Sequence, residues 1–355
     1  MWLNFLFFDN YSANESIFLD NSKYFFNLFQ KNLKFVEISN FSMINYDTKN
    51  WTIPIKTAFG LGNAYDTKEL FKIQLAILLY TATITLGRIY YVPSAVLEIH
   101  LDPTFLSLVG VILGLTLVFR INSAYDRWWE GRKLWGALIN DSRTMASNFH
   151  SILPQNDKQV RHYLASQIAN FAYALKGHLR EGVDFDVLDA YDTYYIEDLK
   201  TATHIPHKIA TNIFMKMEDL YKKRVFSEAD KMNIKHQIEQ LINIMGACER
   251  IKNSPIPFSH TSFIKTFIFF YCLFLPIGLV DKFQLYTIPA VFLISYALAG
   301  VEVISEEIEQ PFGTDANDLP LRHISNVIKA NVYEIMQVPL DQPLPNAKVQ
   351  ENIFM

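Results

Sequence analysis

Four stretches of this 355-residue chain contain no charged side chain, and each is framed by charged residues. The four stretches are Ile73–Gly87, Pro103–Phe119, Thr266–Val280 and Phe283–Val301. A membrane-spanning helix needs about 20 mostly apolar residues, so the first three stretches are slightly short. Flanking side chains such as Lys72, Arg88 and Lys265 can extend them by reaching toward the lipid headgroups. The chain is therefore predicted to cross a membrane four times, as two helical hairpins.

The composition agrees with a membrane protein that also has substantial water-exposed parts. Half of the residues are apolar and 19% are charged, compared with roughly 25% charged in soluble domains. The net charge of −4 does not indicate a nucleic-acid partner, and Cys248 and Cys272 lack metal-type spacing and do not require a disulfide. Arg88 and Lys282 are the only Lys or Arg residues at the hairpin tips, whereas the other side is rich in Lys and Arg. Both termini and the middle segment are therefore predicted to be cytoplasmic.

Residues 119–143 are predicted to mark the point where the second uncharged stretch leaves the bilayer. Arg120 begins a cluster of basic residues there, and three of the five tryptophans of the chain lie within it. These are Trp128, Trp129 and Trp135. Tryptophan rings concentrate at the headgroup level, and basic residues mark the cytoplasmic side. An amphipathic helix of a soluble protein is the alternative interpretation, which the four uncharged stretches disfavour.

The sequence predicts that the chain has six parts. The segment between the hairpins shows apolar stripes with the 3.6-residue period of water-exposed helices. The first 42 residues contain nine Phe and seven Asn without any period, and are either an amphipathic anchor or a non-native extension before a true start at Met43. The predicted parts are an atypical extension 1–42, a cytoplasmic segment 43–68, a first hairpin with the pore helix 69–142, a cytoplasmic helical domain 143–257, a second hairpin 258–305 and a cytoplasmic segment and tail 306–355.

The second uncharged stretch carries a candidate hydrophobic neck. Gly110 and Gly114 form a GxxxG pair, and such small residues let helices approach closely in lipid. The opposite face carries Leu108, Ile112 and Thr116 at intervals of four residues. Several copies of this helix around one axis could line a narrow apolar constriction, which gates by dewetting. Contact of these residues with lipid or with other helices is the alternative.

Acidic side chains follow the fourth stretch. Glu302, Glu306 and Glu309 share one helical stripe. They could line a cytoplasmic vestibule that concentrates cations, or form structural salt bridges with the arginines that follow the second stretch. In the next loop, Asp315 and Asp318 could hold a cation weakly. Two carboxylates are few for Ca²⁺, so a turn capped by one of these side chains is the simpler interpretation.

The sequence contains no residues on which to base an enzyme. It contains no recognisable Gly-rich phosphate loop, nucleophile elbow or zinc motif. His204 and His207 lie three residues apart, but no further ligands can be identified, so neither a metal nor a cofactor is predicted. Three classes of function remain as candidates: a passive ion channel, a secondary transporter, and a membrane-anchored scaffold or receptor. The absence of charged groups from all four stretches favours the channel.

Two motifs resemble the bestrophin family of ion channels, in its bacterial branch. FRxNxAYxRWWExRKLWG is present as Phe119–Gly136, and EExxxPFGxDxNDLP as Glu306–Pro320. The similarity extends from about Met43 to about Met336. The resemblance implies an all-α membrane protein that forms a homopentamer around one central pore. Each subunit would contribute four membrane helices in two hairpins and a cytoplasmic helical domain, with the lipid bilayer and monovalent ions as its other partners.

The resemblance also implies roles for particular residues. The second membrane helix would line the pore, and Ile205, just before a proline at a helix start, would form a second, cytoplasmic constriction. The neck would comprise Leu108, Ile112 and Thr116, or in the neighbouring register Ser107, Val111 and Leu115. Calcium gating in animal relatives uses an acidic loop after PFG, but here neutral residues replace most of those acids, so calcium activation is not predicted. Animal members resemble chloride channels and some bacterial members cation channels, and the sequence is compatible with both.

Overall fold

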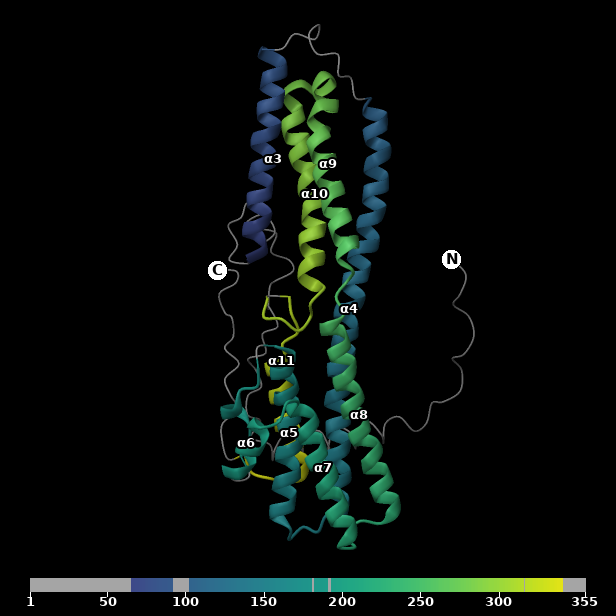
Figure 1. Cartoon of the computed structure of the whole chain (residues 1–355), viewed down its shortest axis with the longest axis vertical. Helices are drawn as coiled ribbons and strands as arrows, with labels where there is room; N and C mark the ends of the chain where they lie inside the picture. The colour runs from purple at the N-terminus through teal and green to yellow at the C-terminus, as the bar shows by residue number, and fades with distance from the viewer. Residues whose placement is uncertain (1–64, 92–101, 181, 191–192, 316, 341–355) are drawn as a thin grey trace, which may run out of the picture. The chain divides into compact units, whose positions relative to one another are not determined.

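The computed structural model describes residues 65–91, 102–180, 182–190, 193–315 and 317–340 (Figure 1). Within these residues, all regular structure is helical. The α-helices are α3 (Tyr65–Tyr90), α4 (Pro103–Ile152), α5 (Lys158–Leu179), α6 (Thr193–Lys200), α7 (Ile205–Lys222), α8 (Glu228–Asn253), α9 (Phe258–Phe283), α10 (Thr287–Ile308) and α11 (Leu321–Met336). Two short 3-10 helices are η1 (Phe185–Val187) and η2 (Gln284–Tyr286). The all-α class is confirmed. The proposed extension 1–42, the start at Met43 and residues 341–355 of the tail lie outside the described residues.

Local sequence signals explain where the long helices begin. α4 starts at Pro103, whose restricted φ suits the first helical position. The carboxylate of Asp102 accepts a 2.8 Å hydrogen bond from the N–H of Thr104 and so satisfies one free donor of the first turn. α8 starts after a reciprocal capping box between Ser227 and Asp230. Both helices therefore begin at positions that short-range chemistry specifies.

The four uncharged stretches lie in α3, the first part of α4, α9 and α10, which together we call the apolar bundle. α10 packs along α3 and α4, and α9 packs along the same two helices (Figure 1). The buried core of the bundle consists of Leu106, Leu113, Leu117, Ile264, Ile268, Tyr271, Cys272, Leu275 and Val291. By length and composition, the segments that could span a membrane are Glu69–Tyr90, Pro103–Ile152 and Phe258–Ile308. The third is interrupted at Gln284, where a φ of 46° ends α9 ahead of η2 and α10.

One glycine of the GxxxG pair permits close helix packing within the subunit. A Cβ atom added at Gly110 would lie 2.6 Å from the hydroxyl of Tyr271 on α9, whereas one added at Gly114 would meet no atom within 4 Å in the described part of the chain. Real Cβ atoms do not approach other atoms as closely as 2.6 Å. Gly110 therefore lets α4 and α9 approach each other, which is the role predicted for a small residue at a helix contact in lipid.

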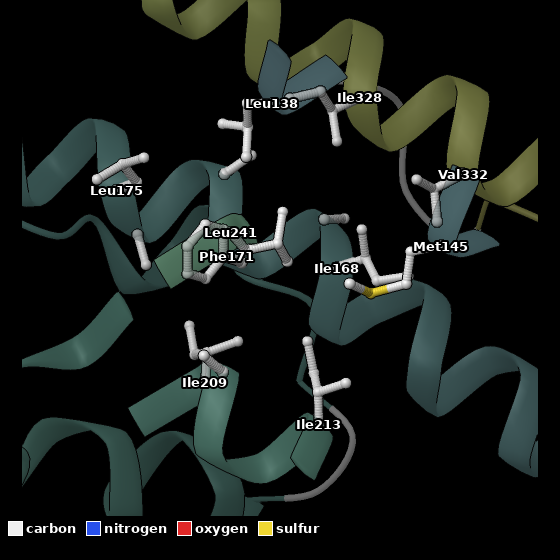
Figure 2. Packing of buried hydrophobic residues seen from close by; sticks show 14 of the residues in the cluster. Leu138, Met145, Ile168, Phe171, Leu175, Ile209, Ile213, Leu241, Ile328 and Val332 are labelled. Atoms are coloured by element: carbon white, nitrogen blue, oxygen red, sulfur yellow. The ribbon is translucent and has the colours of Figure 1, made fainter. Parts of the chain in front are cut away.

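The remainder of α4 packs with α5, α7, α8 and α11 around a second, larger core, and we call this part the mixed bundle. Figure 2 shows part of this core, to which α4 contributes Leu138 and Met145, α5 Ile168 and Phe171, α7 Ile209 and Ile213, α8 Leu241, and α11 Ile328 and Val332. All residues from 164 to 175 of α5 are buried, so this helix is enclosed on every side. α4 runs unbroken through both bundles, and the proposed domain boundary between residues 142 and 143 lies inside it.

The end of α5 is tightly packed, which makes one glycine testable. Gly177→Ala should lower the free energy of unfolding by about 1–3 kcal/mol, the usual cost of overpacking. The added Cβ would lie 2.6 Å from the carbonyl oxygen of Gly182 and 2.6 Å from the Cα of Val183, and neither backbone atom can rotate away. Chemical unfolding in detergent measures the effect.

The control for this change is Gly246→Ala, in the interior of α8. No atom of the described residues lies within 4 Å of a Cβ built at Gly246, so the substitution should be neutral or stabilising by up to about 1 kcal/mol. Equal destabilisation by both substitutions would contradict the packing explanation.

Candidate functional site

The two sequence motifs meet in space at the junction of the two bundles. Arg120, the second residue of the first motif, is completely buried. Its Nη2 donates a hydrogen bond of 2.7 Å to Oε2 of Glu309, and its Nε lies 3.5 Å from Oε2 of Glu302. Both carboxylates are themselves buried, at 4% exposure for Glu302 and 8% for Glu309. A charge in such a place is stable only when it is paired, so this triad joins α4 to the end of α10.

Glu309 connects further segments to the same junction. Its Oε1 accepts a 3.0 Å hydrogen bond from the N–H of Ile256, in the turn between α8 and α9. Its carbonyl oxygen accepts a 3.0 Å hydrogen bond from Nε of Arg127. The two Nη atoms of Arg127 donate 2.6 Å hydrogen bonds to the carbonyl oxygens of Ser254 and Ile251. The two arginines thus hold together α4, α10 and the turn between α8 and α9.

The tryptophans of the first motif do not all lie where the sequence predicted. Trp135 is fully buried in the core of the mixed bundle, so its proposed place at the headgroup level is wrong. Nε1 of Trp128 donates a 3.0 Å hydrogen bond to the carbonyl oxygen of Asn317, in the second motif. A Cβ added at Gly131 would lie 3.1 Å from the ring of Phe312. α4 continues past the apolar bundle, so these residues of the first motif lie against the second motif and the mixed bundle.

Of the three glutamates predicted to line a vestibule, two belong to the buried triad. The third, Glu306, is exposed and forms a 2.7 Å ion pair with Lys265 of α9. The structure thus contains the salt bridges that were the alternative interpretation of this stripe. Glu302 and Glu309 are buried beside the guanidinium of Arg120, so their carboxylates contribute little electrostatic potential in solution. Of the three glutamates, only Glu306 is accessible to solvent.

The loop of the second motif is held by Asp318. Its Oδ2 accepts a 2.7 Å hydrogen bond from the N–H of Asp315, and its own N–H donates to the carbonyl oxygen of Asp315 at 3.2 Å. A Cβ at Gly313 would lie 2.5 Å from the same carboxylate, so glycine makes room for it. Arg180 donates hydrogen bonds of 3.0 and 3.1 Å to the carbonyl oxygens of Phe312 and Leu319, at either side of the turn. These contacts describe a turn organised by side chains.

Asp318→Ala should lower the free energy of unfolding by about 1–2 kcal/mol, because the backbone N–H of Asp315 loses a charged acceptor. Asp315→Ala is the matched control. Asp315 is exposed and contributes its backbone to these hydrogen bonds, so its substitution should change the free energy by less than about 0.5 kcal/mol. Thermal unfolding of both variants in one detergent measures the difference. A larger loss for Asp315→Ala would reverse the assignment.

The predicted neck residues lie on the first part of α4. Leu108 is 61% exposed and Ile112 49% exposed in the single subunit. Thr116 is half-buried, and its hydroxyl donates a 2.8 Å hydrogen bond to the carbonyl oxygen of Leu113. In the neighbouring register, Val111 and Leu115 are 71% and 57% exposed, and Ser107 is exposed as well. One broad apolar face therefore contains both registers, and the choice between them stays a prediction.

Ile205 is the first residue of α7, directly before Pro206, and is half-buried against the core of the mixed bundle. The preceding His204 caps the helix, because its Nδ1 accepts a hydrogen bond from the N–H of His207.

His204 also belongs to a cluster of three polar side chains. Its Nε2 lies 2.6 Å from Oε1 of Glu249 on α8, and Nε2 of His178 on α5 lies 2.8 Å from the same oxygen. The structure thus brings His204 together with two side chains from helices that are distant in the chain. Burial, and next the neighbouring His204, lower the pKa of His178.

The described helices and their long apolar segments define an all-helical membrane protein. Residues 67–334 match the family described as bacterial and fungal bestrophin proteins, and the chain belongs to this family. The resemblance predicted from the two motifs is therefore confirmed. The family is one of channels, and both motifs that meet at the junction between the two bundles lie within the matched residues.

Individual relatives agree with this assignment. The chain is 34% identical over 230 residues to a voltage-dependent anion channel-forming protein of Nostoc sp.. The aligned region covers 64% of this chain and 75% of that protein. The chain is also 30% identical over 252 residues to the voltage-dependent anion channel-forming protein YneE of Salmonella typhi, and this alignment covers 70% of this chain and 80% of YneE. A crystal structure of a bacterial bestrophin homologue from Klebsiella pneumoniae matches with a TM-score of 0.71 at 26% identity, covering 75% of this chain and 98% of that one.

Proposed function

We propose that this protein is a passive ion channel for small monovalent ions, formed by five copies of the chain around one pore. The proposed topology is four membrane helices per subunit, α3, α4, α9 and α10, with both termini on the cytoplasmic side of the bacterial inner membrane. The proposed pore is lined by the exposed face of α4. Leu108, Ile112 and Thr116 form its neck, and Ile205 forms a second constriction in the mixed bundle.

The observation that carries this proposal is the unpartnered apolar face of α4. In the most apolar window of α4, 22% of the residues are buried within the subunit, compared with 17% in the window of α3 and 44% in the window of α9 and α10. The opposite face of α4 packs on α9 and α10, so the exposed face is available to other copies of the chain or to lipid. A ring of apolar side chains that excludes water is an established way to gate a pore.

Anions are the permeant ions that the names of the relatives support, since both are called anion channel-forming proteins. The purified protein should therefore pass current in a planar bilayer under a potassium chloride gradient, with a reversal potential near that of chloride. A reversal potential near that of potassium would replace the proposed selectivity and keep the channel. Zero current, together with a monomer in native mass spectrometry, would contradict the proposed function.

The same recordings test calcium dependence. Tight calcium binding takes six to eight oxygen ligands, usually including several carboxylates. The described part of the loop offers Asp315 and Asp318, and the second of these already accepts a backbone hydrogen bond. Currents should therefore persist in excess chelator. Currents that vanish on chelation and return with micromolar calcium would show that this loop, or another site, is a calcium switch.

A further inference from the structure

His178, His204 and Glu249 bring three ligand atoms together at the ends of three helices of the mixed bundle. Oε1 of Glu249 lies 2.8 Å from Nε2 of His178 and 2.6 Å from Nε2 of His204. The two imidazole rings lie 4.4 Å apart between centroids. One ligand atom from each residue lies within 4.8 Å of the other two, so all three can reach a common ion.

Contacts outside the cluster hold each of these side chains in place. His178 lies in the last turn of α5, where Gly177 is in close contact with the following loop. The carbonyl oxygen of His178 accepts a 2.8 Å hydrogen bond from Nζ of Lys252. His204 is oriented by its capping bond, which occupies Nδ1 and directs Nε2 toward Glu249. Outer contacts of this kind orient the ligands of protein metal sites.

We propose that His178, His204 and Glu249 bind one divalent transition-metal ion, for which Zn²⁺ is the best match. Two imidazole nitrogens and one carboxylate oxygen are a common zinc ligand set, whereas Ca²⁺ and Mg²⁺ prefer oxygen alone. Tetrahedral zinc with bonds of about 2.0–2.1 Å places its ligand atoms roughly 3.3 Å apart. The distances from Oε1 of Glu249 to the two histidine nitrogens, 2.8 and 2.6 Å, would have to lengthen by about 0.5 and 0.7 Å to reach this value, which small side-chain rotations provide.

The surroundings leave room for a fourth ligand. The side chains of His178, His204 and Glu249 are 32%, 37% and 24% exposed, so water can complete the coordination from the solvent side. His207 is not part of the group: its ring meets that of His204 edge-on at 6.0 Å between centroids. The chain thus supplies a neighbouring histidine that serves as a control.

The position of this site suggests a consequence, which rests on the proposed channel function. His204 directly precedes Ile205, the proposed second constriction, and the ion would clamp the start of α7 to the ends of α5 and α8. Five such clamps would surround the pore in a pentamer. Metal binding should therefore change the current by restricting the movement of Ile205.

The binding test uses the full chain, purified in detergent, stripped with chelator and dialysed against zinc chloride. One saturable zinc ion per subunit is expected. His204→Asn keeps a good helix cap but removes the ring, and Glu249→Gln keeps the shape but removes the charge. Each should weaken zinc binding by more than the roughly 10–100-fold that loss of an outer partner costs. His207→Ala should bind as the unchanged protein does.

Thermal unfolding without zinc confirms that each variant is folded before its affinity is compared. Equal zinc binding by His204→Asn, Glu249→Gln and the unchanged protein, or the absence of saturable binding, would overturn the site.

Bilayer recordings then separate the site from its consequence. Zinc added on the side of the mixed bundle should change the current of the unchanged protein and leave His204→Asn unaffected. Saturable binding with an unchanged current would keep the site and overturn its regulatory role. Binding by a protein that passes no current would keep the site and contradict the channel itself.

Discussion

Arg120→Met should lower the free energy of unfolding by about 3–5 kcal/mol, the cost of removing one partner from a buried ion pair. Arg120 is completely buried, and its guanidinium is within 4 Å of the carboxylates of both Glu302 and Glu309. Methionine retains much of the side-chain volume but leaves two buried acids without a cation. Chemical unfolding of the protein in detergent micelles measures the loss.

The matched control is Lys265→Met, which breaks the exposed ion pair with Glu306 on the same end of α10. These side chains are 45% and 59% exposed, so water screens the pair and its removal should cost at most about 1 kcal/mol. Similar losses for Arg120→Met and Lys265→Met would contradict the importance assigned to burial.

A double variant separates the ion pair from simple loss of packing. Glu309→Gln retains an oxygen that can accept from the N–H of Ile256, yet removes one of the two buried charges. Combined with Arg120→Met, it should restore about 0.5–3 kcal/mol relative to the sum of the single changes, as coupled residues do. Strict additivity would show that the two side chains do not interact.

Ile112→Ala should have the largest effect on conduction, because it removes bulk from the proposed neck in every subunit. A wider and less apolar ring holds water more readily, so conductance or open probability should rise. The size of the rise relative to Val111→Ala, at 71% exposure, identifies the register. Single-channel recording in planar bilayers measures both quantities.

Leu79→Ala on α3 is the control for this experiment. Leu79 is 61% exposed in the subunit, as apolar as Ile112, and lies outside the proposed pore helix. Its substitution should leave conductance unchanged. Equal effects of Leu79→Ala and Ile112→Ala would point to altered lipid contacts. Cysteines at positions 108, 112 and 116 that stay inaccessible from the pore would show that the proposed register is wrong.

The sequence alone was sufficient for the helical class, the family and the location of the apolar helices. Absence of charge over a long stretch is a strong signal, because a charged side chain in lipid is costly wherever the neighbouring helices lie. Helix starts such as Pro103 are equally readable, since a cap satisfies donors within the first turn. The length of α4 was not readable, because its composition changes at Arg120 while its helix continues.

Tertiary structure decided what the charged and aromatic residues of the motifs do. Arg120 and Trp135 looked like markers of a membrane boundary, yet they are buried against partners up to 189 residues away in the sequence. The sequence did not link His204 to His178 and Glu249, because these residues belong to other helices. Periodicity and local chemistry act over a few residues, so they specify the elements. Which side chains meet depends on how those elements pack, and only the folded chain determines that.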